Sequence, residues 1–171
     1  DTVMSFGFKY GLPPDVDLTD GTYRPGRDIS RQALAAFLWR LAGSPEVDAG
    51  PYFSDVGADH TFATAIAWAV EEGISEGYGD GTFRPSAPIT RQALAAMLWR
   101  LAGAPAPEPG APSFHDVDGD HPFHPAITWL AEVEVAGGYE DGGFHPGERS
   151  SRQAMAAFLH RFDGVHQVPR Q

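Results

Sequence analysis

The chain has 171 residues, of which 42% are apolar and 12% aromatic, and its formal net charge is −11 at pH 7. This composition is typical of a globular protein and argues against a nucleic-acid partner, because phosphate binding requires a basic surface. The absence of cysteine excludes disulfide bonds and thiolate metal sites, and no apolar run is long enough for membrane insertion.

The first 43 residues contain an irregular segment followed by a helical pattern. Residues Asp1–Asp17 alternate apolar and polar side chains and include two glycines, which predicts a strand and a turn. The segment Asp20–Pro25 predicts a tight loop. From Ile29 to Gly43 the apolar spacing predicts a helix that has Ser30 as its N-cap and ends at the glycine.

Residues 52–103 form the most complete unit. Phe53–Val56 opens it, and Asp59–Thr61 offers capping residues to a helix over about Phe62–Glu72. The glycine-rich segment Gly77–Pro85 predicts a tight loop with some strand character. A second helix is predicted over Ile89–Gly103.

Residues 113–164 repeat this unit. Phe114–Val117 matches the opening, Pro125 lies at the start of the first helix, and Gly138–Pro146 matches the glycine loop. The second helix is predicted over Ser150–Gly164. The segments 44–51 and 104–112, rich in proline, glycine and alanine, are predicted to be linkers.

The second helix has nearly the same sequence in all three units, so an internal repeat determines the predicted fold. We predict a mostly α protein: three helix-loop-helix repeats (1–43, 52–103 and 113–164) forming a pseudo-three-fold helical bundle with short strand-like glycine loops. One unit cannot bury its apolar face alone, so the three should fold cooperatively. The faces expected to meet at the axis are Leu34, Phe37, Leu38 and Leu41; Leu94, Met97, Leu98 and Leu101; and Met155, Phe158, Leu159 and Phe162.

A second line of side chains runs along the same helices. Arg31, Ala35 and Trp39 are four residues apart, and the pattern recurs from Arg91 and, with a histidine in place of tryptophan, from Arg152. An arginine one turn from a small residue and two turns from an aromatic residue predicts a shallow groove with a cationic end.

These motifs resemble the S-layer homology domain. The resemblance implies an exported chain that is anchored non-covalently to the cell wall, usually through three repeats. Its ligand would be a secondary cell-wall polysaccharide or peptidoglycan-linked glycan, often carrying an acidic pyruvyl ketal, bound in grooves between repeats. The residues that carry the resemblance are Phe53-x-Asp55-Val56, Ile66-x-Trp68, Gly73-Ile74, Gly77-Tyr78-x-Asp80-Gly81-Thr82-Phe83-x-Pro85 and Ile89-Thr90-Arg91.

The chain departs from the family signature Thr-Arg-Ala-Glu at the second helix. The arginine is kept in all three copies, but the glutamate that would complete a capping box is replaced by Ala33, Ala93 and Ala154. The cap is left to the hydroxyl alone, and the arginine loses its nearest carboxylate. This either frees the arginine for an anionic sugar or indicates a different ligand.

The predicted ligand contacts begin with Arg31, Arg91 and Arg152, because a guanidinium at a helix N-terminus can bind a carboxylate with help from first-turn amides. The alternative is a structural ion pair with a neighbouring repeat. Trp68 and Trp129 are candidate sugar platforms, with packing between repeats as the alternative. The predicted set is completed by the following glutamines, Gln32, Gln92 and Gln153.

No catalytic or metal-binding constellation is recognisable. There is no Gly-x-Ser-x-Gly elbow and no phosphate loop. Asp116–Asp120 resembles the start of a calcium loop, but Ile127 stands where the bidentate glutamate is required. We therefore predict a chain that is not an enzyme and uses no cofactor or metal.

The predicted function is a non-catalytic, extracellular module that anchors a larger exported protein to an anionic wall polysaccharide through inter-repeat grooves. The alternative is a protein-interaction or surface-layer assembly module whose grooves take a peptide or a neighbouring copy. A third interpretation is a piece of a wall hydrolase whose catalytic domain lies elsewhere.

Overall fold

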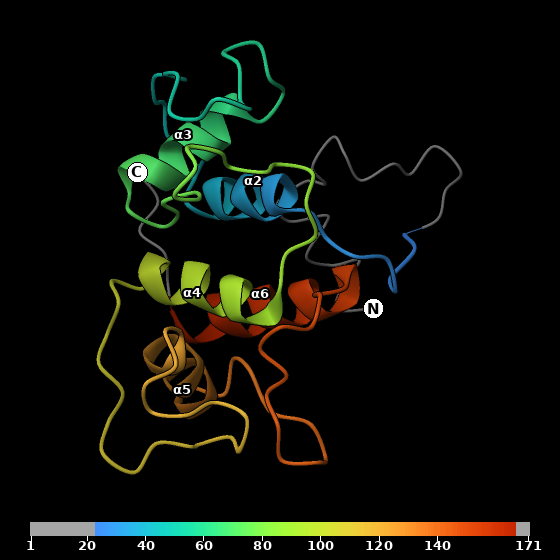
Figure 1. Cartoon of the computed structure of the whole chain (residues 1–171), viewed down its shortest axis with the longest axis vertical. Coiled ribbons are helices and arrows are strands. Elements are labelled where there is room, and N and C mark those ends of the chain that lie inside the picture. The colour runs from blue at the N-terminus through green and yellow to red at the C-terminus, as the bar shows by residue number, and fades with distance from the viewer. Residues whose placement is uncertain (1–22, 167–171) are drawn as a thin grey trace.

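A computed structural model describes residues 23–166, and the predictions for Asp1–Asp17 and Asp20 lie outside this range. All regular elements in this part of the chain are helices, joined by long loops (Figure 1). The mostly α class is confirmed. The helices are α2 (Arg31–Leu41), α3 (Ala63–Glu71), α4 (Arg91–Leu101), α5 (His124–Glu132) and α6 (Arg152–Val165).

The second helices α2, α4 and α6 occupy the middle of the molecule (Figure 1). Each begins at its predicted N-cap, whose hydroxyl accepts a hydrogen bond from the third amide of the helix. The donor–acceptor distances are 3.3 Å at Ser30, 3.4 Å at Thr90 and 3.2 Å at Ser151. The cap hydroxyl therefore fixes these starts without the glutamate of a capping box.

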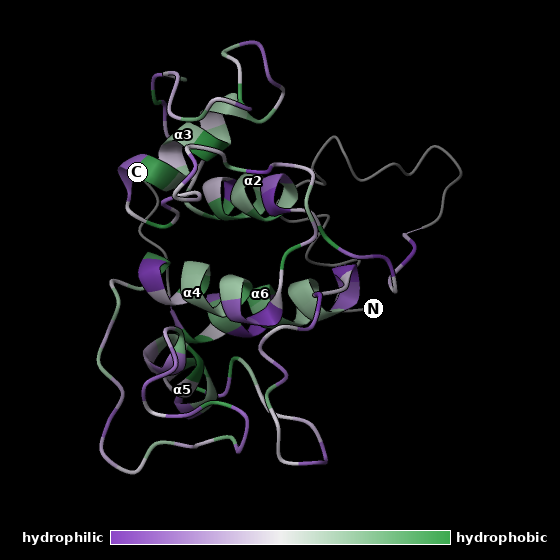
Figure 2. Cartoon of the chain, viewed as in Figure 1, coloured by the Kyte–Doolittle hydropathy of each residue, from purple (hydrophilic) through white to green (hydrophobic). Residues whose placement is uncertain are grey.

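The predicted apolar faces of these helices form the core, with only Leu101 half-buried. Figure 2 shows apolar residues concentrated on the helices and hydrophilic residues along the loops. The alanines between the apolar positions are also covered, including Ala35 and Ala95 at 0% exposure. The second helices are thus enclosed on more sides than a single amphipathic stripe predicts.

The helices that pack together come from consecutive repeats. α2 packs against α3, and α4 packs against α5 (Figure 1). The compact lobe is therefore a second helix with the first helix of the following repeat. The sequence repeat, which pairs α3 with α4, is offset from this packing unit by one helix.

The segments just before α2, α4 and α6 form a closed ring of backbone hydrogen bonds. Ile29 N–H donates to the Ser150 carbonyl at 3.0 Å, Ser150 N–H to the Ile89 carbonyl at 2.8 Å, and Ile89 N–H to the Ile29 carbonyl at 2.9 Å. Isolated antiparallel bridges flank the ring. This cyclic pattern confirms the pseudo-three-fold arrangement and includes the first repeat.

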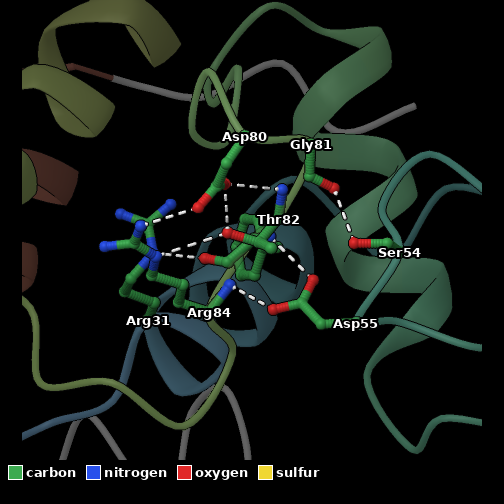
Figure 3. Close-up of polar contacts among 8 residues, drawn as sticks. Arg31, Ser54, Asp55, Asp80, Gly81, Thr82 and Arg84 are labelled. Carbon is green, nitrogen blue, oxygen red and sulfur yellow. Dashed lines mark hydrogen bonds and ion pairs between the residues drawn. The ribbon is translucent and has the colours of Figure 1, made fainter.

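The glycine loops of the second and third repeats are each fastened by the aspartate of the Phe-x-Asp-Val opening. The two carboxylate oxygens of Asp55 accept hydrogen bonds from the amides of Phe83 and Arg84 at 2.8 and 2.7 Å (Figure 3). Asp116 holds the third repeat's loop in the same way, at 2.8 and 2.7 Å. The loop conformation therefore depends on a carboxylate about 28 residues upstream.

One predicted helix boundary was wrong. The helix α6 continues through Gly164 to Val165, whereas α2 and α4 end before their glycines. In those two copies a tryptophan indole holds the following linker, and the third copy has His160 instead. The helix α3 lies where it was predicted, and within the predicted capping segment it is His60 whose ring Nδ1 accepts from the Phe62 amide, at 3.2 Å.

Candidate ligand-binding junctions

The three predicted arginines lie where one repeat meets the next. The first junction is Arg31 against residues 77–87, the second is Arg91 against residues 138–148, and the third is Arg152 against residues 23–27. Each junction combines the start of a second helix with the glycine loop of the following repeat, and the third returns to the first repeat.

In the first junction Arg31 lies beneath the glycine loop (Figure 3). Its Nε donates a 2.8 Å hydrogen bond to the Phe83 carbonyl. Its guanidinium carbon is 4.9 Å from the centre of the Tyr78 ring, and that of Arg84 is 3.9 Å from the same ring. The guanidiniums of Arg31 and Arg84 therefore both make cation–π contacts with the ring of Tyr78. Arg84 is also paired with Asp80 at 2.8 Å.

The second junction repeats this arrangement around Arg91. Its Nε donates to the Phe144 carbonyl at 2.8 Å, and an amino group donates to the Gly137 carbonyl at 3.1 Å. Its guanidinium carbon is 4.7 Å from the centre of the Tyr139 ring. On that ring, His145 takes the place of the second arginine, with centroids 4.4 Å apart.

The third junction is less regular. One amino group of Arg152 donates to the Tyr23 carbonyl at 3.0 Å, and the Tyr23 hydroxyl donates to the Arg152 carbonyl at 3.2 Å. Within the described residues, the buried Nε of Arg152 has no hydrogen-bond partner. A cavity of about 230 Å³, lined in part by Arg27, Gln32 and Arg152, lies beside this junction.

The first-turn amides of the second helices are already occupied. The amides of Arg31 and Gln32 donate to the carbonyls of Ala87 and Pro85, and the cap hydroxyl takes the third amide. The other copies repeat these bonds, which join one repeat to the next. The expectation that these amides assist in binding an anion was therefore wrong: they bind neighbouring loop carbonyls.

The arginines are also less accessible than an open groove predicts. Arg31 is 8% exposed, and Arg91 and Arg152 are 6% exposed. Burial lowers the pKa of Arg31 and of Arg91, but arginine starts so high that both remain charged. The acceptors of the three guanidiniums within residues 23–166 are backbone carbonyls rather than carboxylates. Each junction consequently keeps the charge of its arginine.

The carboxylate at the edge of the first junction is strongly ionised. Hydrogen bonds from Thr82, and then from Arg84, lower the pKa of Asp80 to about 2. Burial acts to raise the pKa of Asp116, but bonds from the Phe144 and His145 amides outweigh burial and leave it lowered. Both carboxylates are therefore charged near neutral pH.

The two predicted tryptophans differ in how deeply they are buried. Trp68 is 3% exposed and belongs to the core, so its ring offers no face to a sugar in this conformation. Trp129 is half-buried against the core. Of the predicted glutamines, Gln32 and Gln92 are half-buried and Gln153 is exposed. The ligand roles of these residues remain predictions.

Sequence reasoning missed the tyrosines of the junctions. Tyr78 is 39% exposed and Tyr139 is 43% exposed, and each covers the arginine of its junction. The available signal was the Gly-Tyr pair that opens each of these two glycine loops. These tyrosines are the exposed aromatic residues of the first two junctions, whereas Trp68 is enclosed in the core.

Residues 23–166 contain no helix long and apolar enough to cross a membrane. The same range contains no group of three or more histidine, aspartate or glutamate residues arranged to hold a metal ion.

Comparison with known proteins agrees with the repeated architecture. The S-layer homology domain model matches residues 52–95 and 113–156, together more than half of the chain. Cell surface glycoprotein 1 of Acetivibrio thermocellus is 33% identical over 156 residues, covering 83% of this chain and 7% of that protein. The S-layer protein sap of Bacillus anthracis is 33% identical over 118 residues, covering 68% of this chain and 14% of that protein.

A third relative is the Cellulosome-anchoring protein of Acetivibrio thermocellus, which is 33% identical over 90 residues, covering 51% of this chain and 20% of that protein. The chain thus spans between 7% and 20% of the lengths of these relatives. Their cell-surface character and the helical repeat indicate a location outside the cell, at its surface. With its family model matched at two repeats that together cover more than half of the chain, the chain belongs to the S-layer homology domain family.

Proposed function

We propose that this chain is a non-catalytic anchoring module that binds an acidic, pyruvylated cell-wall polysaccharide at its inter-repeat junctions. The observation that carries the proposal is the repeated placement of Arg31, Arg91 and Arg152 against carbonyl acceptors, with no carboxylate bonded to these guanidiniums among residues 23–166. In a chain of net charge −11, this positions cations where a sugar carboxylate can be recognised.

The burial of the arginines defines how a ligand would approach. Tyr78 and Tyr139 lie over the first two guanidiniums and reach solvent. A sugar stacked on the tyrosine would bring its acidic group to the rim, where the guanidinium acts through charge. Gln32, Gln92, Gln153 and Trp129 are the further contacts in this proposal, and Trp68 would act from the core by supporting the lobe.

Three junctions on one rigid body favour a polymer over a single sugar. When one junction holds the polysaccharide, the others meet its next units at high effective concentration. Weak sites are then sufficient for durable attachment. A larger exported protein, of which this module forms a small part, would be the cargo, in keeping with the small share of each relative that the chain spans.

The test is co-sedimentation with purified wall polysaccharide, before and after removal of its pyruvyl ketals by mild acid. Replacing Arg31, Arg91 and Arg152 with glutamine removes three charges at similar side-chain length. We expect retention to fall at least tenfold, with circular dichroism confirming that the variant is folded. The matched control replaces Arg40, Arg100 and Arg161, each of which lies nine residues after the tested arginine in the same helix. Unchanged retention by a folded triple variant would contradict the proposal.

The burial of the arginines also favours a second candidate, a protein-interaction or surface-layer assembly module. In that case the exposed tyrosines would contact a peptide or another copy of the chain, and no free carboxylate would need to reach the guanidiniums. Concentration-dependent oligomers in sedimentation velocity, formed without polysaccharide and lost when Tyr78 and Tyr139 become alanine, would support this candidate over the first.

A further inference from the structure

The first two junctions differ at one position that otherwise has the same geometry. Arg84 and His145 are pseudo-equivalent: both follow a buried phenylalanine, and both have left-handed backbone, with φ of 56° and 57°. Arg84 pairs with Asp80 at 2.8 Å, and the Nε2 of His145 lies 2.7 Å from Asp141. Each side chain also lies against the junction's tyrosine. A fixed cation in one junction is thus replaced by a titratable group in the other.

Charges in the first junction are balanced at every physiological pH. Arg31 and Arg84 are permanent cations, while Asp55 and Asp80 supply two carboxylates. Ala87 is equivalent to Glu148 of the third repeat, so the first junction lacks a carboxylate at this position.

The second junction is acidic when its histidine is neutral. Among residues 23–166, Arg91 is the one permanent cation that contacts Tyr139. Three carboxylates, those of Asp116, Asp141 and Glu148, contact His145 on the same side of the junction. The nearby Arg149 is turned to the first repeat, where it bonds Asp28 at 3.2 Å. Protonation of His145 adds the cation that the first junction has permanently.

We propose that His145 makes the second junction a pH-dependent site that accepts an anionic sugar in mildly acidic surroundings and disfavours it above neutral pH. This inference rests on the proposed function, because it assigns a regulation to one of the same junctions. Histidine is suited to the role because its charge changes between pH 5 and 8.

His145 lies where the positive charge of its protonated ring can act on a ligand bound at the second junction. The side chain of His145 is 38% exposed, and its ring stacks on that of Tyr139, the proposed sugar platform. Its Nδ1 lies 3.7 Å from Glu148, whose carboxylate also accepts from the Tyr139 hydroxyl at 2.7 Å. The charged and titratable groups around the ring are Asp141, Glu148, Asp116, Tyr139, Arg91 and His115.

The expected effect is moderate. A unit charge about 4 Å from a ligand carboxylate in a water-like medium changes affinity roughly fivefold. The affinity of the second junction should therefore fall by about three- to fivefold between pH 5.5 and 7.5. The first junction, with arginine at the equivalent position, should not change.

The experiment follows both junctions in one molecule. A ¹⁵N-labelled chain is titrated by NMR with a pyruvylated oligosaccharide at pH 5.5 and 7.5. The amides of Gly81 and Thr82 report the first junction, and those of Gly143 and Phe144 report the second. The variants are His145→Arg, which should remove the pH dependence, His145→Gln, which should bind weakly at both pH values, and Arg84→His, which should transfer the dependence to the first junction.

These outcomes separate the inference from the proposed function. Equal affinity of the second junction at both pH values, or no binding there at either pH while the first junction binds, would overturn the inference alone. A pH dependence that persists in His145→Arg would also overturn it, because it would then come from one of the six histidines that remain in that variant: His60, His115, His121, His124, His160 and His166. No binding at either junction in any variant would overturn the proposed function and the inference with it.

Discussion

At the scale of single residues, Ser150 is the member of the backbone hydrogen-bonded ring whose side chain fits its surroundings least well. Ser150 occupies the place that Ile29 and Ile89 take in the other repeats, and it is 1% exposed. Within the described residues, its buried hydroxyl has no hydrogen-bond partner. An unsatisfied buried polar group is destabilising, and a smaller side chain also packs less apolar surface.

We therefore predict that Ser150→Ile stabilises the protein by about 1–2 kcal/mol, since it removes the unsatisfied hydroxyl and restores the apolar side chain of the other copies. Urea unfolding followed by circular dichroism measures the change. The reciprocal variant Ile89→Ser should lose stability. A Ser150→Ile variant that is less stable than the parent chain would show that the neighbours have already closed over the serine.

The position of the three arginines could be predicted from the sequence of one repeat, but their burial could not. Their position at a helix start was readable from Ser30-Arg31, because caps and periodicity are local. Their burial was not, because the covering groups, Tyr78 and the Phe83 carbonyl, come from the following repeat about 50 residues away. Side chains supplied by another segment leave no trace in the spacing of the helix itself.

At the scale of elements, the linkers determine which helices pack together. The indole nitrogens of Trp39 and Trp99 donate to the carbonyls of Pro45 and Pro105 at 2.9 and 2.7 Å. These bonds turn the chain back at the ends of α2 and α4 and direct it to the first helix of the next repeat. The offset between sequence repeat and packed lobe follows from this turn.

We predict that Trp99→Phe weakens the protein by about 1 kcal/mol, the typical net worth of one hydrogen bond, while keeping most of the ring packing. Limited proteolysis should cut segment 104–112 faster in this variant, and urea unfolding should measure the loss. Segment 44–51, still held by Trp39, is the internal control. Equal cleavage rates of segment 104–112 in parent and variant would show that the indole bond does not restrain the linker.

Helix positions were predictable and some helix ends were not. The spacing and caps of α2, α4 and α6 predicted their starts, whereas Gly164 failed to predict the end of α6. A glycine ends a helix when the chain is also turned aside, as at Gly43 with φ of 94°. In the third copy the residue that would hold a linker is His160, which is exposed, and the helix continues.

At the scale of the whole molecule, the ring makes the three repeats interdependent. The Ile29–Ser150 and Ser150–Ile89 bonds both require the third repeat, as do the first-turn bonds of α4 to the Pro146 and Glu148 carbonyls. A chain ending at residue 103 would leave these groups without their partners and would lack α5, the helix that packs against α4.

We therefore predict that residues 1–103 alone do not fold cooperatively, whereas the full chain melts in one transition, as expected for repeats that bury their faces only together. Differential scanning calorimetry distinguishes the two. Adding residues 104–171 in trans should restore helical circular dichroism to the fragment. A sharp independent transition of residues 1–103 would show that two repeats suffice.

The closure between Tyr23 and Arg152 spans 129 positions, so it forms only after almost the entire described segment is available. Contacts at such separation slow folding, because a long loop must be closed before they form. The contacts between α2 and α3 are closer in sequence and can form earlier. Joining the third repeat back to the first is therefore expected to be among the last steps of folding, so that the complete three-repeat body is reached only when the whole of residues 23–152 has been synthesised.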